Sequence, residues 1–219
     1  MPLPTSNFFL YNIFMKKFPD VIPVFPLSGV IYFPKTNLPL NIFEQRYLDL
    51  VNDAYKKDKL MGMVQSKKGD SDVYDIGCLG KISDYQKIKD GRILINLTGI
   101  SRFRILKEIS SKKLYREFEV DYQSFNEDIK SSYDKINTVI LMEKAKTFFK
   151  RNGLLLNWIE FEKLDHIQKI NTLAMIAPIT NEEKQKLLET VSLKNKVEIL
   201  ESIISFYLHE TNLNNQTIQ

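Results

Sequence analysis

The sequence has a single cysteine, Cys78, among its 219 residues, so no disulfide can form within the chain. A chain of this size without disulfides is typical of a reducing compartment, and we expect a cytoplasmic protein. Cys78 lies in the apolar run 75–80, where we favour a buried, inert thiol over a nucleophile because neither histidine is near it in sequence. No run approaches the roughly 20 apolar residues of a membrane helix, so no membrane partner is expected.

Sequence patterns of catalytic sites are also missing. The chain has no P-loop pattern, no dinucleotide-binding glycine pattern and no G-x-S-x-G elbow. His166 and His209 are far apart and lack the spacing of a zinc-binding H-E-x-x-H pair. We therefore predict no catalytic residues, no metal site and no cofactor, in a protein that is not an enzyme.

Charge of one sign is not concentrated anywhere in the chain. The 31 basic and 27 acidic residues are interspersed and leave a formal net charge of +4. Interspersed charge is typical of a solvated surface, whereas nucleic-acid-binding domains more often gather their basic residues on one face. Nucleic acid is therefore not the partner that we expect.

The character of the sequence changes near residue 125. Seven of the eight glycines come before it among short β-rich segments, and only Gly153 lies in the helical periodicities after it. We predict an N-terminal extension (1–18), a β lobe (19–125), a helical lobe (126–210) and a flexible tail (211–219). Since Met15-Lys16-Lys17 looks like a translation start, we expect residues 1–14 to contribute little to the fold.

Short alternating segments predict a strongly curved or barrel-like sheet in the β lobe. Strands are expected over 21–25, 60–65 and 76–85, and Asp90-Gly91 is a hairpin turn signal. Beyond the turn, apolar residues recur at every second position from Ile93, as in a strand with one buried face.

Two further expectations concern particular side chains of the β lobe. Asn41 and Glu44 fit a variant of the capping box at the start of a helix. Arg102 and Arg104 lie on the face of the expected strand away from Phe103. They could bind acidic groups, and salt bridges with Glu117 or Glu119 on a neighbouring strand would explain them as well.

Apolar residues at helical spacing fill the second half of the chain. A long helix is expected over 129–153, and another over 167–177 that is stopped by Pro178. Thr180 and Glu183 form a capping box that opens a short helix, and a last helix is expected over 193–208.

Residues 23–47 resemble the opening of the Lon protease N-terminal domain family. Stand-alone members typically read P-L-F-P-L-x-x-V-x-F-P-x-x-x-L-P-L-x-I-F-E-x-R-Y, and this chain reads P-V-F-P-L-S-G-V-I-Y-F-P-K-T-N-L-P-L-N-I-F-E-Q-R-Y. Shorter matches follow in order at 62–64, 76–78, 90–92, 99–105, 115–116 and 183–189, so that the resemblance spans roughly 19–205. The residues that carry it, for which we expect structural roles, are Phe43, Glu44, Arg46, Tyr47, Gly91, Arg92, Gly99, Arg102 and Phe103.

The resemblance implies an α+β fold, with a PUA-like β-barrel-type N-terminal lobe followed by an α-helical C-terminal lobe. It implies a non-catalytic, ATP-independent module that binds unfolded or partly folded proteins or peptides in protein quality control, with a separate protease or chaperone as a further partner. The candidate client-binding surface is an apolar loop between Gly29 and Pro34, made of Val30, Ile31, Tyr32 and Phe33. The alternative is that these side chains close the end of the barrel.

Two other functions remain open from the sequence. PUA-like folds elsewhere bind RNA, which would require Arg92, Arg102 and Arg104 to share an exposed face with aromatic side chains. An adaptor that docks on a protease or chaperone would instead need an exposed apolar stripe on the last helix. Burial of its apolar residues Leu193, Val197, Leu200 and Ile204 would count against an adaptor.

Overall fold

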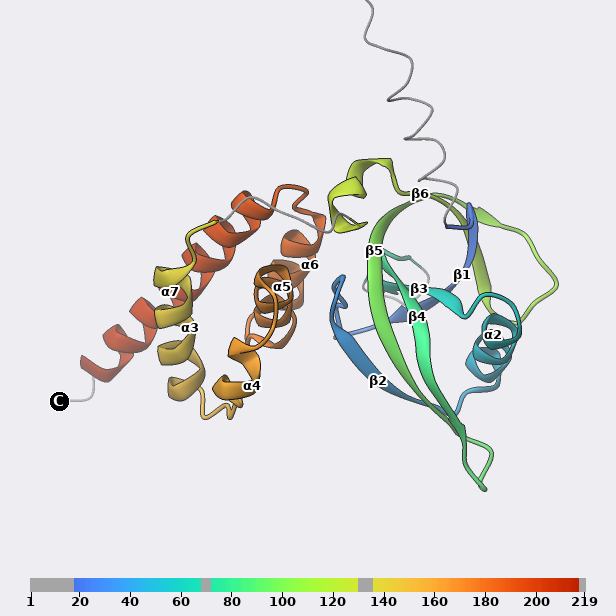
Figure 1. Ribbon diagram of the computed structural model, residues 1–219, viewed down its shortest axis with the longest axis horizontal. Helices are drawn as coiled ribbons and strands as arrows, with labels where there is room; N and C mark the ends of the chain where they lie inside the picture. Colours follow the sequence, from blue (N-terminus) through green and yellow to red (C-terminus); the bar gives the residue numbers. More distant parts are fainter. Residues whose placement is uncertain (1–17, 68–71, 130–135, 217–219) are drawn as a thin grey trace, which may run out of the picture.

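The computed structural model describes residues 18–67, 72–129 and 136–216. A β-barrel lobe and a helical lobe lie side by side in the molecule (Figure 1). The α+β class and the order of the two lobes are therefore confirmed.

Six strands form the first lobe. They are β1 (Val21–Leu27), β2 (Asn37–Ile42), β3 (Leu60–Gln65), β4 (Ile76–Lys87), β5 (Ile93–Ile109) and β6 (Arg116–Asp121). Strand β1 pairs in parallel with β3 and antiparallel with β6, and β5 joins β4 to β6. The cycle β1-β3-β4-β5-β6 is thereby closed, while β2 pairs only with the first half of β5 among the described strands.

The length and bend of β5 allow this closure. Its 17 residues pair with β2 at one end and with β6 at the other, and the β4–β5 ladder contains two register shifts that bend the sheet. Inside the barrel, the buried Phe103 ring occupies space that a side chain at Gly62 or Gly77 would fill, because a Cβ there would approach the ring to 2.9 or 2.6 Å. The two glycines thus let a large ring pack at the centre of a small barrel.

Helix α2 (Gln45–Lys56) packs on the barrel through one apolar face made of Tyr47, Leu50, Val51 and Ala54. Glu44 occupies the N-cap position of this helix without a side-chain cap hydrogen bond, and Asn41 lies within β2 opposite Leu94, so the expected cap at Asn41 is wrong. Pairing with β5 holds residues 41 and 42 in extended conformation, and the helix can begin only after the strand ends.

The second lobe contains five α-helices in the described part of the chain. They are α3 (Val139–Arg151), α4 (Trp158–Glu162), α5 (His166–Ile176), α6 (Asn181–Glu189) and α7 (Leu193–Gln216). The capping box at Thr180 is confirmed, and a second one at Asp165 opens α5.

The long helix expected over 129–153 begins only at Val139 in the structure. A separate 3-10 segment, η1 (Gln123–Ile129), precedes α3, and the predicted lobe boundary at 125 falls within it. Helix α7 continues to Gln216, beyond residue 211 where the flexible tail is predicted to begin. Residues 1–17, which include the proposed upstream extension, lie outside the described residues, whereas Phe18 packs its ring on Tyr122.

The two lobes share one apolar core. Ile31, Phe33 and Ile76 from the barrel belong to the same cluster of buried residues as Leu173 and Leu187 of the helical lobe. A shared core fixes the relative position of the lobes, because separating them would expose these side chains to water.

A buried ion pair lies at the same interface. Arg102 of β5 is 2% exposed and donates to Asp128 of η1 and to three backbone carbonyls at the end of α6, those of Leu188, Thr190 and Val191. The expected partners are wrong, since Glu117 pairs with Lys113 and Glu119 with Lys107. Arg102 does lie on the outer face of β5, but the helical lobe covers that face.

Candidate functional site

The apolar loop expected to meet clients is largely buried. Ile31, Tyr32 and Phe33 are 3%, 2% and 0% exposed, and only Val30 reaches the surface. Tyr32 contributes to the barrel core, and Ile31 and Phe33 contribute to the core between the lobes. Burial of these three side chains favours the alternative, in which they fill the fold itself, over an exposed client-binding loop.

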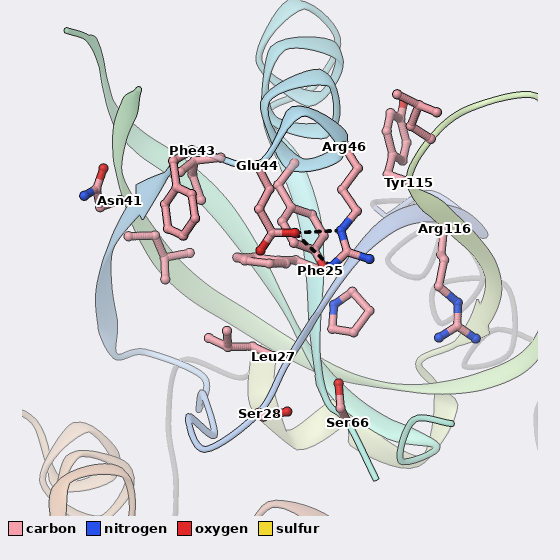
Figure 2. Close-up of a pocket in the computed structure, with 15 residues that line it drawn as sticks. Phe25, Leu27, Ser28, Asn41, Phe43, Glu44, Arg46, Ser66, Tyr115 and Arg116 are labelled. Carbon is pink, nitrogen blue, oxygen red and sulfur yellow. Dashed lines mark hydrogen bonds and ion pairs between the residues drawn. The ribbon is translucent and has the colours of Figure 1, made fainter. Parts of the chain in front are cut away.

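A groove on the barrel lobe is the best candidate for a binding site (Figure 2). It has a cavity volume of about 380 Å³, and we call it the β1–β2 groove because the end of β1 and the end of β2 form two of its walls. The start of α2 and the segment that enters β6 complete it. The residues that line it include Phe25, Pro26, Leu27, Leu40, Asn41, Phe43, Arg46, Leu114 and Arg116.

The rim of the groove carries two large apolar side chains in water. Phe43 and Leu114 are each 66% exposed, although they come from segments some 70 residues apart. Phe25 and Tyr47 are buried and support the floor, and the centroids of their tilted rings are 4.1 Å apart. Apolar surface that is exposed around a concavity is typical of a site that a partner covers.

The charges at the groove are held in pairs. Arg46 donates to the Glu44 carboxylate at 3.0 Å from Nε, as Figure 2 shows, and its guanidinium also lies over the Tyr47 ring. Arg116 makes a two-pronged contact with Glu108 on the neighbouring strand. The guanidinium of Arg116 holds the pKa of the Glu108 carboxyl below its usual range. Both arginines are thus oriented before any ligand arrives.

A second hydrogen bond fixes the wall that carries Leu114. The Tyr115 hydroxyl donates to the Asp53 carboxylate of α2 at 2.7 Å. Burial of the ring raises the pKa of Tyr115, so the hydroxyl stays protonated and able to donate. The wall is therefore tied directly to α2.

The structure brings together only part of the set of family-motif residues. Phe43, Glu44, Arg46 and Tyr47 all line the β1–β2 groove. The other five lie elsewhere, at the hairpin tip (Gly91, Arg92), under the Phe33 carbonyl (Gly99), at the lobe interface (Arg102) and in the barrel core (Phe103). The first four form a site, whereas the others contribute to the architecture.

The requirement of the RNA-binding alternative is not met. Arg102 is buried, while Arg92 lies at an exposed hairpin and pairs with Asp90 at 2.7 Å. Since a buried guanidinium cannot contact a phosphate backbone, the three arginines do not form one basic surface.

In the part of the last helix whose side chains the structure describes, the apolar residues named above do not form the exposed stripe that an adaptor would need. Val197, Leu200 and Ile204 are buried in the core of the helical lobe, and Leu193 packs against it. The condition set from the sequence for docking through this helix is therefore not met.

Reasoning from the sequence alone did not recognise the groove. The sequence predicts a structural role for Phe43, because nothing in the pattern distinguishes an exposed aromatic residue next to a helix from a buried one. Leu114 follows Lys112 and Lys113 in a polar stretch, and this isolated apolar residue was the one available signal.

Sequence reasoning also missed a buried lysine. Lys196 of α7 is 3% exposed and donates to Asn171 at 3.1 Å, and the Asn171 amide donates to the Pro34 carbonyl of the barrel lobe at 2.9 Å. Burial and the nearby charge of Arg102 lower the pKa of Lys196 to about 7. Its position three residues after Leu193, on the apolar side of the helix, was the missed signal.

None of the described helices is long and apolar enough to cross a lipid bilayer. In the same part of the chain, no three His, Cys, Asp or Glu side chains gather where they would bind a metal ion together. Cys78 is fully buried, and burial raises the pKa of its thiol well above the ordinary value.

The fold and the groove together define a two-lobed binding domain. Its small barrel carries the groove and shares a common core with the helical lobe. The family described as the ATP-dependent protease La (LON) substrate-binding domain matches residues 21–205, and the chain belongs to that family.

Relatives and solved structures agree with this assignment. The chain is 28% identical over 208 residues to a Lon protease of Syntrophus aciditrophicus, which covers 88% of this chain and 26% of the relative. It is 25% identical over 200 residues to Lon protease 2 of Myxococcus xanthus, covering 85% of this chain and 24% of that protein. The chain thus spans about a quarter of the length of these relatives.

Two solved structures share the fold. The Lon N-terminal domain protein from Xanthomonas campestris superimposes with a TM-score of 0.61 at 22% identity, over 83% of this chain and 97% of that one. The N-terminal domain of Mycobacterium avium complex Lon protease gives a TM-score of 0.63 at 17% identity, over 84% and 98%. The two-lobed architecture is therefore shared at low sequence identity.

Proposed function

We propose that this protein is a non-catalytic module that binds unfolded segments of other proteins in the β1–β2 groove. The observation that carries the proposal is the pair of exposed apolar side chains, Phe43 and Leu114, that line a preformed cavity. Unfolded chains differ from folded ones in presenting apolar side chains to solvent, and a rimmed apolar groove binds such side chains through the hydrophobic effect.

Membership of a substrate-binding domain family supports this choice of ligand class. On the same proposal the protein acts in protein quality control in the cytoplasm, and it delivers its clients to a separate protease or chaperone. The inert, buried Cys78 suits a reducing compartment.

Binding of a permanently unfolded protein tests the proposal. The probe is fluorescently labelled α-lactalbumin that has been reduced and carboxymethylated, and fluorescence anisotropy gives the dissociation constant. We expect Phe43→Ser and Leu114→Ser each to weaken binding by about tenfold, because each removes one large apolar contact from the rim. Native, folded α-lactalbumin should not compete.

The helical lobe provides matched controls. Leu155 and Ile159 are 102% and 76% exposed, and they lie just before and within α4 of the helical lobe, which stands apart from the barrel lobe that carries the groove (Figure 1). The changes Leu155→Ser and Ile159→Ser remove the same kind of apolar surface and should leave binding unchanged. If they weaken binding as much as the groove variants do, the groove is not the binding site.

A further inference from the structure

Two strand edges border the β1–β2 groove, and an open edge ordinarily invites an extended peptide to add as a further strand. Strand β2 is an edge strand of the sheet, and β1 loses its neighbour β6 after Val24. The direction of the backbone groups along these two edges determines whether a peptide can pair with them.

On β1, alternation places Pro26 at the open edge. The Asp20 carbonyl accepts from Val120 of β6, so residues 20, 22 and 24 direct their backbone groups toward β6. Residue 26 has the same orientation, but β6 does not extend beside it. Proline has no N–H, so this outward position cannot donate to an incoming strand.

On β2, alternation places Pro39 in the middle of the open edge. The Gly99 amide of β5 donates to the Thr36 carbonyl, so residues 36, 38, 40 and 42 face β5 and residues 37, 39 and 41 face away. Pro39 is exposed, lacks a donor and directs its ring toward any strand that would lie there. Asn41 is the outward residue of β2 that lines the groove, and it keeps both its N–H and its carbonyl.

On each edge, one of the outward positions is a proline, which prevents a continuous ladder of main-chain hydrogen bonds. Edge prolines of this kind oppose strand addition. The apolar rim and the preoriented arginines remain as the means of recognition. We infer, resting on the function proposed above, that the groove reads the side chains of an extended polypeptide segment and takes almost no affinity from its backbone.

Backbone esters separate the two modes of binding. The probe is the fluorescein-labelled peptide Gly-Ser-Leu-Ser-Phe-Ser-Leu-Ser-Gly. It has two twins: in one, backbone esters replace the amides of the serine residues, and in the other they replace the amides of the leucine and phenylalanine residues. Each set covers one edge of a strand. We expect each twin to bind within about threefold of the parent, whereas strand addition predicts a loss of about a hundredfold for one of them.

A third peptide, with serine in place of leucine and phenylalanine, should bind at least about tenfold more weakly than the parent. Phe43→Ser should weaken the parent and both esters equally. If Phe43→Ser weakens the parent but one ester loses a hundredfold, side-chain reading is wrong and the groove remains the site. If Phe43→Ser changes the binding of no peptide, the proposed function fails together with this mode of recognition.

Discussion

The guanidinium of Arg102 and the carboxylate of Asp128 form a two-pronged buried pair, with Nη2–Oδ1 at 2.8 Å and Nε–Oδ2 at 2.9 Å. Their side chains are 2% and 9% exposed. Since Arg102 also donates to carbonyls at the end of α6, this one side chain connects a barrel strand, η1 and the helical lobe.

Breaking this pair from one side should destabilise the protein strongly. Asp128→Asn leaves a buried guanidinium without its counter-charge, so we expect the free energy of unfolding to fall by about 3–5 kcal/mol. Urea denaturation measures the change. The double variant Arg102→Met, Asp128→Leu removes both charges and should recover much of the loss, and a double variant as unstable as Asp128→Asn would contradict this account.

Lys196 should make the stability depend on pH just above neutrality. Its pKa of about 7 in the folded protein lies below the ordinary lysine value of about 10.4, so between these values the unfolded chain binds a proton that the folded chain does not. Stability should therefore rise with pH, by roughly 1.5 kcal/mol from pH 7 to 8.5. Above that range the raised pKa of the Cys78 thiol has the opposite effect and lowers the stability as pH rises.

Replacing the lysine should remove this dependence. We expect Lys196→Met to be more stable than the wild type at pH 7 and to show a flatter profile up to pH 8.5, because no buried amine is left to desolvate. Urea midpoints at several pH values provide the measurement. Lys194→Met, at a position of the same helix whose side chain is 73% exposed, is the control and should keep the wild-type slope.

Gly99 should not tolerate a side chain. A Cβ at this position would lie 2.3 Å from the Phe33 carbonyl oxygen, and the segment around Phe33 is held against β5 by the Lys35–Gly99 and Gly99–Thr36 backbone hydrogen bonds. We expect Gly99→Ala to lower the free energy of unfolding by about 2 kcal/mol or more, as overpacking does. Gly91→Ala, where a Cβ meets nothing but the backbone φ is +93°, should cost about 1 kcal/mol.

Pro39 should protect the edge of β2 from other molecules of the same protein. Pro39→Val restores an outward N–H and removes the ring, so we expect concentration-dependent association through this edge, which sedimentation velocity detects. Asn37→Val places the same apolar residue on the same edge without adding a donor, and its association should be the same as that of the wild type. Equal association of both variants would point to added hydrophobicity as the cause.

Much of the architecture follows from local sequence. The period-2 pattern from Ile93, the Asp90-Gly91 turn and the capping box at Thr180 each depend on residues close together in the chain, and the structure has a strand, a turn and a helix start at these places. The residues that resemble the Lon N-terminal family lead to the same fold. The α+β class and the order of the lobes were determined at this level, because backbone preference and side-chain periodicity are local properties.

The partners and surroundings of side chains were decided only in three dimensions. The pattern placed Arg102 on the outer face of its strand, but only the docking of the helical lobe buries that face and supplies Asp128 as its partner. The pattern left Phe33 open between a client-binding loop and the closed end of the barrel, and it is fully buried, whereas Phe43 was expected to be structural and is two-thirds exposed on the rim of a groove. Burial depends on which distant segments pack together, and a hydrophobic residue has the same local signature in a core and on a binding surface.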